Sequence, residues 1–291
     1  MAETTLPTPS ESPIGAASPT ASTSKVQQEG KLVRNVRAML MVWRRDLIRL
    51  FRMPTRIITG IAQPLLFLFV LGAGLEAAIG RNGAAGVNYQ QYLFPGILAM
   101  SVLTSALFSA IAIVWDREFG FMREMLVAPV SRSSLVLGKA LGGGSVAVAQ
   151  GLVLVVFAPL VGVSFTILSF FEMLFFMLLL AFSLTAFGIV IASRMQRMES
   201  FQMVMALVLQ PMLFLSGAIF PLTALPVWLA VITRLNPATY GVDAIRRVVV
   251  PGVDPLTIFD WVVPLWFDAL VTFGFGVAML AIAIQLFGKT E

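Results

Sequence analysis

Residues 170–192 read FFEMLFFMLLLAFSLTAFGIVIA, and this stretch decides the fold of the chain. Apart from Glu172 near its start it carries no charge, and it is long enough to cross the hydrocarbon core of a bilayer, about 30 Å thick, as one helix. Similar apolar stretches occur at residues 57–75, 92–114, 142–163, 201–219 and about 261–287. Charged residues make up only 12% of the 291 residues, about half of the roughly 25% that is usual for soluble proteins. The sequence therefore predicts an all-α membrane protein with six transmembrane helices.

The N-terminal segment, residues 1–30, is rich in Ser, Thr, Pro and Ala and contains no apolar core. We expect a disordered tail and not a signal peptide, which needs an apolar stretch of about 7–15 residues. Residues 31–291 then form the membrane domain. We expect the chain in the cytoplasmic (inner) membrane of a bacterium. The positive-inside rule places both termini in the cytosol, because nearly all Lys and Arg then face inward. The exceptions are Arg81, Arg234, Arg246 and Arg247.

Residues 31–53 are predicted to form an amphipathic helix. Leu32, Leu40 and Trp43 belong to its apolar stripe, and arginines fill the opposite side. A basic amphipathic helix of this kind is typical of segments that lie along the anionic headgroups of a membrane. The alternative is a soluble helix that packs on a partner domain. Pro54 and the first span follow at once, which favours the interfacial position.

The chain contains no Cys and no His, which excludes thiol nucleophiles, disulfides, imidazole catalysis and zinc sites with Cys or His ligands. Gly138-Lys139-Ala140 lacks the Ser or Thr and the upstream glycine of a phosphate-binding loop, so ATP hydrolysis would need another polypeptide. No acidic or basic residue has to lie at the membrane centre, where ion-coupled carriers commonly place one. We therefore predict a non-catalytic protein with no metal or cofactor of its own. Its basic residues cluster beside the spans, which argues against a nucleic-acid partner.

The charged stretch between the second and third spans, residues 115–132, carries the most information. On a helix, Trp115, Phe119, Met122 and Leu126 would share one side. Pro129 would end this helix. A short cytosolic helix with an apolar ridge is suited to docking in a groove of a partner protein. The alternative is a solvated loop that only sets the topology, but such a loop needs neither the ridge nor the proline.

Residues 220–250 follow the fifth span and are too apolar for an ordinary loop, yet too rich in proline for a clean span. Irregular backbone at membrane depth survives only against protein or water. We therefore predict an outer re-entrant pair, in which two short helices dip into the outer leaflet.

Three segments carry a resemblance to a known family. They are Trp43–Asp46 with Gln63–Gly72, Asp116–Arg132 with Gly138-Lys139, and Asn236–Arg246. With these segments in this order, the sequence resembles the permease subunits of type-2 ABC exporters, a group that includes the daunorubicin-type drug-resistance transporters. The resemblance implies a permease that dimerises and joins a nucleotide-binding ABC ATPase subunit, which would bind the ATP and Mg²⁺. It does not cover the N-terminal tail.

The resemblance also implies roles for particular segments. Residues 31–53 would be the interfacial connecting helix, and residues 116–132 the coupling helix that contacts the ATPase. The ATPase-coupling residues would be Asp116, Arg117, Glu118, Phe119, Gly120, Met122, Arg123, Glu124, Leu126, Pro129, Ser131 and Arg132. The re-entrant motif would be Asn236, Pro237, Tyr240, Asp243 and Arg246.

The expected function is export of an amphiphilic or hydrophobic substrate, such as a drug, a polyketide or a lipid-like molecule, through a cavity beside the first, second and fifth spans at the dimer seam. Amides and hydroxyls would line this route, namely Gln63, Ser101, Thr104, Ser105, Gln202 and Gln210. Hydrogen bonding between helices is the alternative role for such groups. A glycan or lipid-linked precursor is the alternative substrate. An ATP-independent secondary carrier or a non-transporting scaffold is the alternative function.

Overall fold

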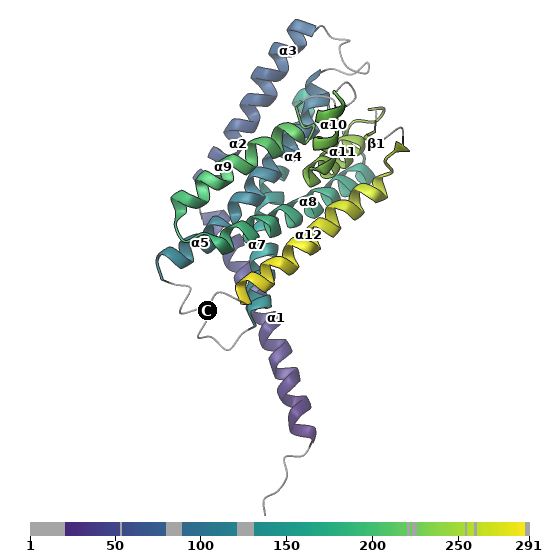
Figure 1. Cartoon of the computed structure of the whole chain (residues 1–291). Helices are drawn as coiled ribbons and strands as arrows, with labels where there is room; N and C mark the ends of the chain where they lie inside the picture. Colours follow the sequence, from purple (N-terminus) through teal and green to yellow (C-terminus); the bar gives the residue numbers. More distant parts are fainter. Residues whose placement is uncertain are drawn as a thin grey trace, which may run out of the picture.

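The computed structural model of the chain describes residues 21–52, 54–79, 89–120, 131–219, 222, 226–253, 255–258 and 261–288. Within this part of the chain, six helices are long and apolar enough to cross a membrane, and they form a single bundle (Figure 1). The spans are Ile57–Ala77, Tyr89–Glu118, Arg132–Val155, Ile167–Arg194, Met198–Leu215 and Leu265–Phe287. The prediction of an all-α membrane protein with six spans is confirmed.

Spans 2, 3 and 4 form the centre of the bundle. Span 2 comprises α4 (Tyr89–Ser109) and α5 (Ile111–Glu118), span 3 is α7 (Arg132–Val155) and span 4 is α8 (Ile167–Arg194). Between 56% and 67% of their apolar windows is buried, against 17% to 22% for spans 1, 5 and 6. Small residues allow the close approach: a Cβ on Gly188 of α8 would lie 2.7 Å from the Leu107 carbonyl oxygen of α4. Spans 1, 5 and 6 therefore make the outer layer.

Span 1 is irregular. Its first helix, α2 (Pro54–Leu66), passes into a π-helical turn, η1 (Phe67–Leu71), and then into α3 (Gly72–Ile79). Pro64 has no backbone N–H to continue the hydrogen-bond ladder, and the wider turn begins just after it. Such π turns are frequent at functional sites.

The N-terminal helix α1 covers Ala21–Arg52, so residues 21–30 are helical, inside the segment that was predicted to be a disordered tail. Residues 1–20 lie outside the described residues.

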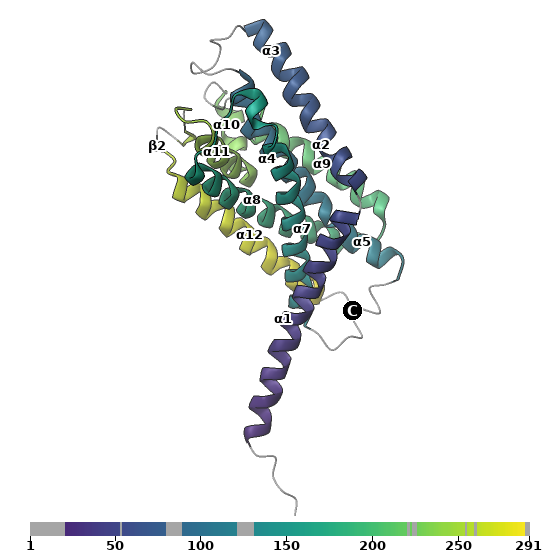
Figure 2. The ribbon, with the colours of Figure 1, turned by 180° about the vertical axis from the view of Figure 1, so that it is seen from behind.

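Helix α1 runs beside the first half of α7 and in the same direction, while its first turns extend beyond the bundle (Figure 2). The Ser131 N–H donates to Asn35 Oδ1 at 3.1 Å, and the Trp43 indole donates to Ser145 Oγ at 3.0 Å. Leu32 on the apolar stripe is 66% exposed. A position along the membrane surface stays a prediction for this helix.

After the centre of the bundle come span 5 and the outer segment. Span 5 is α9 (Met198–Leu215). The short helices α10 (Val227–Leu235) and α11 (Pro237–Val249) occupy the place of the expected re-entrant pair, and their entry into the membrane stays a prediction. The strands β1 (Thr257–Ile258) and β2 (Trp261–Val262) pair antiparallel, with Thr257 opposite Val262. Span 6 is α12 (Leu265–Gly288), and it begins at Leu265, not at residue 261, because Trp261 belongs to the strand pair.

The third span begins at Arg132, not at residue 142. Ser131 caps it, because its side chain accepts from the Ser134 N–H. The helix ends at Val155, and a 3-10 turn, η2 (Ala158–Val161), follows.

The expected continuous helix from Trp115 to Leu126 is wrong in its described part. Helix α5 ends at Glu118, and Gly120 has a φ of +80°, a left-handed conformation that an α-helix cannot contain. Residues 121–130, which hold the rest of the predicted coupling helix, lie outside the described residues.

Candidate functional site

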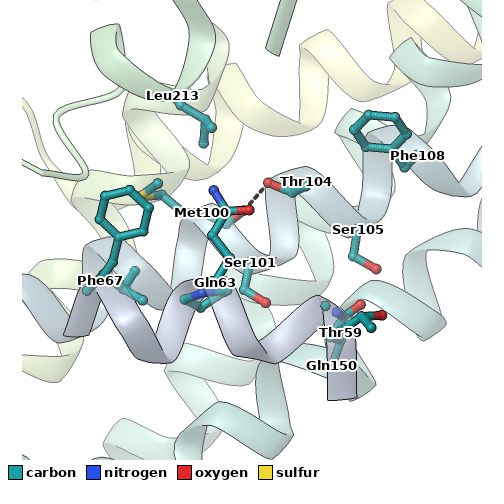
Figure 3. A pocket seen from close by; sticks show the side chains of 13 residues that line it. Thr59, Gln63, Phe67, Met100, Ser101, Thr104, Ser105, Phe108, Gln150 and Leu213 are labelled. Carbon is teal, nitrogen blue, oxygen red and sulfur yellow. Dashed lines mark hydrogen bonds between the residues drawn. The ribbon is translucent and has the colours of Figure 1, made fainter. Parts of the chain in front are cut away.

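A cavity of about 250 Å³ lies between spans 1, 2, 3 and 5 (Figure 3). Span 1 contributes Thr59, Gly60, Gln63, Pro64 and Phe67; span 2 contributes Ile97, Met100, Ser101, Thr104, Ser105 and Phe108; spans 3 and 5 contribute Gln150 and Leu213. Helical periodicity places the residues of span 2 on one side of α4, and this side faces α2. No residue that lines the cavity carries a formal charge.

Polar groups form a band inside this cavity, between aromatic and aliphatic ends. Figure 3 shows Gln63 from α2 beside Ser101 and Thr104 from α4. The Thr104 hydroxyl donates to the Met100 carbonyl oxygen at 2.8 Å, so its proton is already used within its own helix. The buried Ser101 hydroxyl has no hydrogen-bond partner among the described residues. The band thus offers amide and hydroxyl groups to a neutral polar group of a ligand, while Phe67 and Phe108 offer apolar surface.

The structure brings together four of the predicted lining residues, namely Gln63, Ser101, Thr104 and Ser105. It places Gln202 and Gln210 elsewhere, exposed on α9 outside the cavity lining. They do not line this cavity, and their place on a transport route stays a prediction. Gln150 also lines the cavity: it stands out in the sequence as a Gln in an apolar span, but the predicted lining left it out. Gly60 packs against the Gln150 amide, and a Cβ there would overlap it.

At the end of span 2 where α5 stops, Asp116 joins three elements. Lys139 of α7 donates to Asp116 Oδ2 at 3.2 Å, and Arg45 of α1 approaches the same oxygen at 3.9 Å. Arg45 is about half exposed, so solvent weakens its contribution. Asp116 therefore holds α1 and α7 to the end of α5.

The next residues hold the link between spans 4 and 5. Arg117 donates to the carbonyl oxygens of Ser193 at 2.9 Å and Met195 at 2.8 Å, at the end of α8. Glu118 Oε2 accepts from the Met198 N–H at 3.0 Å, at the start of α9. A cation at a helix C-terminus and an anion at a helix N-terminus are the arrangements that the helix dipole favours. These contacts make the end of α5 a junction of four other helices.

Of the other predicted coupling residues, Phe119 and Gly120 are exposed. Trp115 and Phe119 are 45% and 58% exposed, and their ring centroids lie 5.2 Å apart, so they present an aromatic pair at this end of span 2. Ser131 caps α7, and Arg132 donates to the Phe287 carbonyl oxygen at 3.2 Å. The remaining ones, Met122, Arg123, Glu124, Leu126 and Pro129, lie outside the described residues.

The residues of the predicted re-entrant motif lie on α11 and at its N-cap. Asn236 caps this helix, because its side chain accepts from the Ala238 N–H, and Pro237 occupies the first turn, where no N–H is needed. The Tyr240 hydroxyl donates to the Arg234 carbonyl oxygen at 2.8 Å and ties α11 to α10. The motif therefore builds the corner between the two short helices.

A buried ion-pair cluster follows on α11. Arg247 pairs with Asp243 at 2.8 Å, one turn away, and with Asp268 of α12. Burial raises the pKa of Asp243, and the attraction of Arg247 opposes this rise. Arg246 is buried as well, with its guanidinium 4.3 Å from the centre of the Tyr92 ring. Sequence reasoning missed Asp268, which is fully buried, although a lone carboxylate in an apolar span indicates a functional or paired site.

Among the described residues, no group of three or more acidic side chains is placed to hold a metal ion.

Comparison with known proteins agrees with this arrangement. A transport permease named ycf38 from Cyanophora paradoxa is 33% identical over 213 residues, which cover 72% of this chain and 73% of the relative. A Nodulation protein J from Rhizobium leguminosarum bv. trifolii is 32% identical over 223 residues, which cover 74% of this chain and 83% of the relative. The family model described as ABC-2 type transporter matches residues 37–250, from α1 to the end of α11. Since the match covers more than half of the sequence and every residue that lines the cavity, the chain belongs to the ABC-2 type transporter family, as a multi-pass membrane permease.

Proposed function

We propose that this chain is the membrane subunit of an ATP-driven exporter, which moves an amphiphilic or hydrophobic substrate out across the cytoplasmic membrane. The cavity between spans 1, 2, 3 and 5 carries the proposal. Its lining combines Phe67, Phe108 and Leu213 with uncharged amides and hydroxyls. Such a lining suits a largely apolar ligand with a few neutral polar groups, and it has no charge to hold a small ion.

Hydrolysis of ATP, with its Mg²⁺, is assigned to a separate ABC ATPase subunit, because the sequence has no phosphate-binding loop. The partner would dock at the cytosolic end of span 2, where Trp115 and Phe119 are exposed. A movement of this end, caused by the ATPase, would be transmitted to four helices. Asp116 contacts α1 and α7, Arg117 contacts α8, and Glu118 contacts α9. These contacts support the coupling role of this segment.

A second copy of the permease would cover the sides of spans 1 and 5, which lie beside each other in both views of the bundle (Figures 1 and 2). Gln63, Gln202 and Gln210 are exposed there. An amide that faces lipid without a partner is costly, so these side chains fit a protein interface or a wet route better than a lipid surface. The exposed side of α12, by contrast, is apolar, with Trp266 and Phe273 at 64% and 55% exposure, and it suits lipid.

The test is substrate-stimulated ATPase activity of the complex reconstituted with its ATPase, measured with a panel of lipophilic compounds. Gln63→Ala should raise the substrate concentration for half-maximal stimulation at least about fivefold, which corresponds to one lost hydrogen bond of about 1 kcal/mol. Gln285→Ala is the matched control, because Gln285 is an exposed Gln on α12 away from the cavity. An equal response of both variants would remove the cavity from the transport route.

A further inference from the structure

The outer end of span 5 is held by side-chain hydrogen bonds as well as by packing. The last carbonyl groups of a helix have no partner within the helix. Here Asn236 Nδ2 donates to the Met212 carbonyl oxygen at 2.9 Å. The Thr239 hydroxyl shares its proton between the carbonyl oxygens of Thr233 of α10, at 2.7 Å, and Leu215 of α9, at 3.1 Å. Both donors belong to α11, so α11 caps the end of α9.

The chain beyond α9 continues this pattern. Arg246 of α11 donates to the carbonyl oxygens of Gly217 at 2.6 Å and Ala218 at 3.1 Å. The Tyr89 hydroxyl of α4 donates to that of Ile219 at 3.2 Å. Gly217 has a φ of +73°, which turns the chain so that these carbonyl groups face α11 and α4.

Apolar packing holds α9 weakly by comparison. Only 22% of its apolar window is buried, against 67% for span 2. Its outer end does pack, since Leu213 and Ala218 are buried in the core, and hydrogen bonds to neutral carbonyl groups add to this packing. Each such bond stabilises the contact by about 1 kcal/mol, or by about 1.5–3 kcal/mol where the donor is charged. Because this net stabilisation is small, bonds to water can replace these bonds once the contact opens.

These contacts lie directly outside the cavity. Met100 of α4 and Leu213 of α9 line the cavity, and Gly96 of α4 packs on the Ala218 carbonyl, where a Cβ would overlap it. Tyr92, which lies under the Arg246 guanidinium, is about 13 Å from Ser101 along the helix axis at 1.5 Å per residue. Separation of the α9 end from α4 would therefore open the cavity toward the outer surface.

The two neighbouring arginines of α11 hold different partners. Arg247 is paired with Asp243 and with the fully buried Asp268 of α12, and it also donates to the Val263 carbonyl oxygen at 2.7 Å. Arg246, by contrast, donates to the carbonyl oxygens of Gly217 and Ala218, just after α9, and has the Tyr92 ring beneath it. Because removal of a buried charge from its counter-charge costs several kcal/mol, α11 is expected to stay with α12 while α9 is released.

We propose that Arg246, together with Asn236, Thr239 and Tyr89, is the outer latch of the transport route: it positions the outer end of span 5 against span 2 and keeps the cavity closed to the outside. The proposal rests on the proposed function, since it assigns a gate to that cavity. It treats Arg246 as a positioning residue that acts through the α9 carbonyl groups.

The chain has no Cys, so one reporter thiol can be introduced without removal of others. Ser101→Cys places a thiol in the cavity, where the native hydroxyl has no partner among the described residues to lose. Intact cells that hold the permease with its ATPase are treated from outside with a membrane-impermeant maleimide, and the labelling rate of this thiol is measured. Arg246→Met should raise the rate at least about tenfold, and Arg246→Lys should raise it less, because one ammonium replaces only part of the guanidinium fork.

Gly96→Ala is the second variant, because it presses on the same carbonyl group without change of charge. It should also raise the labelling rate at residue 101. Arg234→Met is the matched control: Arg234 lies in the same outer segment but donates to the Thr257 carbonyl oxygen of β1. This variant should leave the rate unchanged.

A second reporter, Ser183→Cys, lies in the centre of the bundle, where Ser183 is buried against α12. Labelling at residue 183 in the Arg246→Met background would mean general loosening and would overturn the latch. Unchanged labelling at residue 101 in both Arg246→Met and Gly96→Ala would overturn it as well. The labelling rate needs no transported substrate, so a failed Gln63 test with faster labelling would overturn the proposed function and leave the gate in place.

Discussion

Replacement of Arg247 by Met tests whether the buried cluster on the outer side is a real ion pair. Arg247 lies between two carboxylates, at 2.8 Å from Asp243 Oδ2 and in contact with Asp268. The side chains of all three are at most 13% exposed, so water screens these charges little. Without Arg247, the two carboxylates would be left buried with only Arg246 as a nearby cation.

The magnitudes follow from these contacts. Removal of one partner of a buried pair costs about 3–5 kcal/mol, so Arg247→Met should destabilise the permease by about 4 kcal/mol. Asp268→Asn leaves Arg247 paired with Asp243 and removes one charged hydrogen bond, at a cost of about 2 kcal/mol. In the double variant residue 268 is an uncharged Asn, so the loss of Arg247 no longer leaves the fully buried Asp268 carboxylate without its counter-charge. We therefore expect about 4 kcal/mol for it and not about 6, a coupling energy of about 2 kcal/mol.

The assay is equilibrium unfolding of the wild-type, single and double variants in mixed detergent micelles, followed by tryptophan fluorescence. A coupling of about 2 kcal/mol is close to a thirtyfold difference in the unfolding equilibrium constant, well above experimental error. Gln285→Ala serves as an exposed control on α12. Costs of the two substitutions that add within about 0.5 kcal/mol would refute the ion pair and, with it, the argument that α11 is anchored to α12.

Three further predictions concern the centre and the inner end. Arg117→Met, which removes two caps from the end of α8, should lower the free energy of unfolding by about 3 kcal/mol in the same assay, and Arg117→Lys should restore part of it. Gly188→Leu should prevent monodisperse assembly in size-exclusion chromatography, because the added side chain would press on Leu107 of α4; Gly274→Leu, at an open position of α12, should not. Phe119→Asp should separate the permease from its ATPase on co-purification while the elution profile of the permease stays normal, since Phe119 is 58% exposed; retained ATPase would contradict docking at this end.

The fold could be predicted because the bilayer fixes the length of each span, and hydropathy reports that length directly. The errors lie at the ends, where local backbone chemistry decides. Hydropathy suggested that the third span begins at the glycine run 142–144, but the Ser131 cap starts α7 well before it. The glycines lie inside the helix, where Gly142 packs against Asp46 and Gly143 against Thr185. They are sites of close packing and not a helix start.

The site was predictable only in part, for a related reason. Polar residues in apolar spans stand out in a sequence, and Gln63 and Ser101 were found in this way. Which side of a helix faces the bundle depends on the neighbouring helices. The sequence alone therefore could not show that Gln150 lines the cavity while Gln210 is exposed outside it. The role of Asp268 could not be predicted for the same reason. It depends on the ion pair with Arg247, which is distant in sequence and lies in a segment without clear hydropathy.

Span 5 connects the two ends of the molecule. It is an 18-residue helix, about 27 Å long, held at its inner end by Glu118 and at its outer end by α11. A motion imposed at Glu118 therefore reaches the outer carbonyl groups as a tilt of one rod. The inner contact has to survive each cycle, since it transmits the motion, whereas the outer contact has to break. We accordingly expect opposite defects. Glu118→Gln should reduce transport per ATP hydrolysed without faster labelling of Ser101→Cys from outside, and Arg246→Met should speed that labelling while the ATPase stays bound. If both variants gave the same defect, α9 would not be the element that links the two sides.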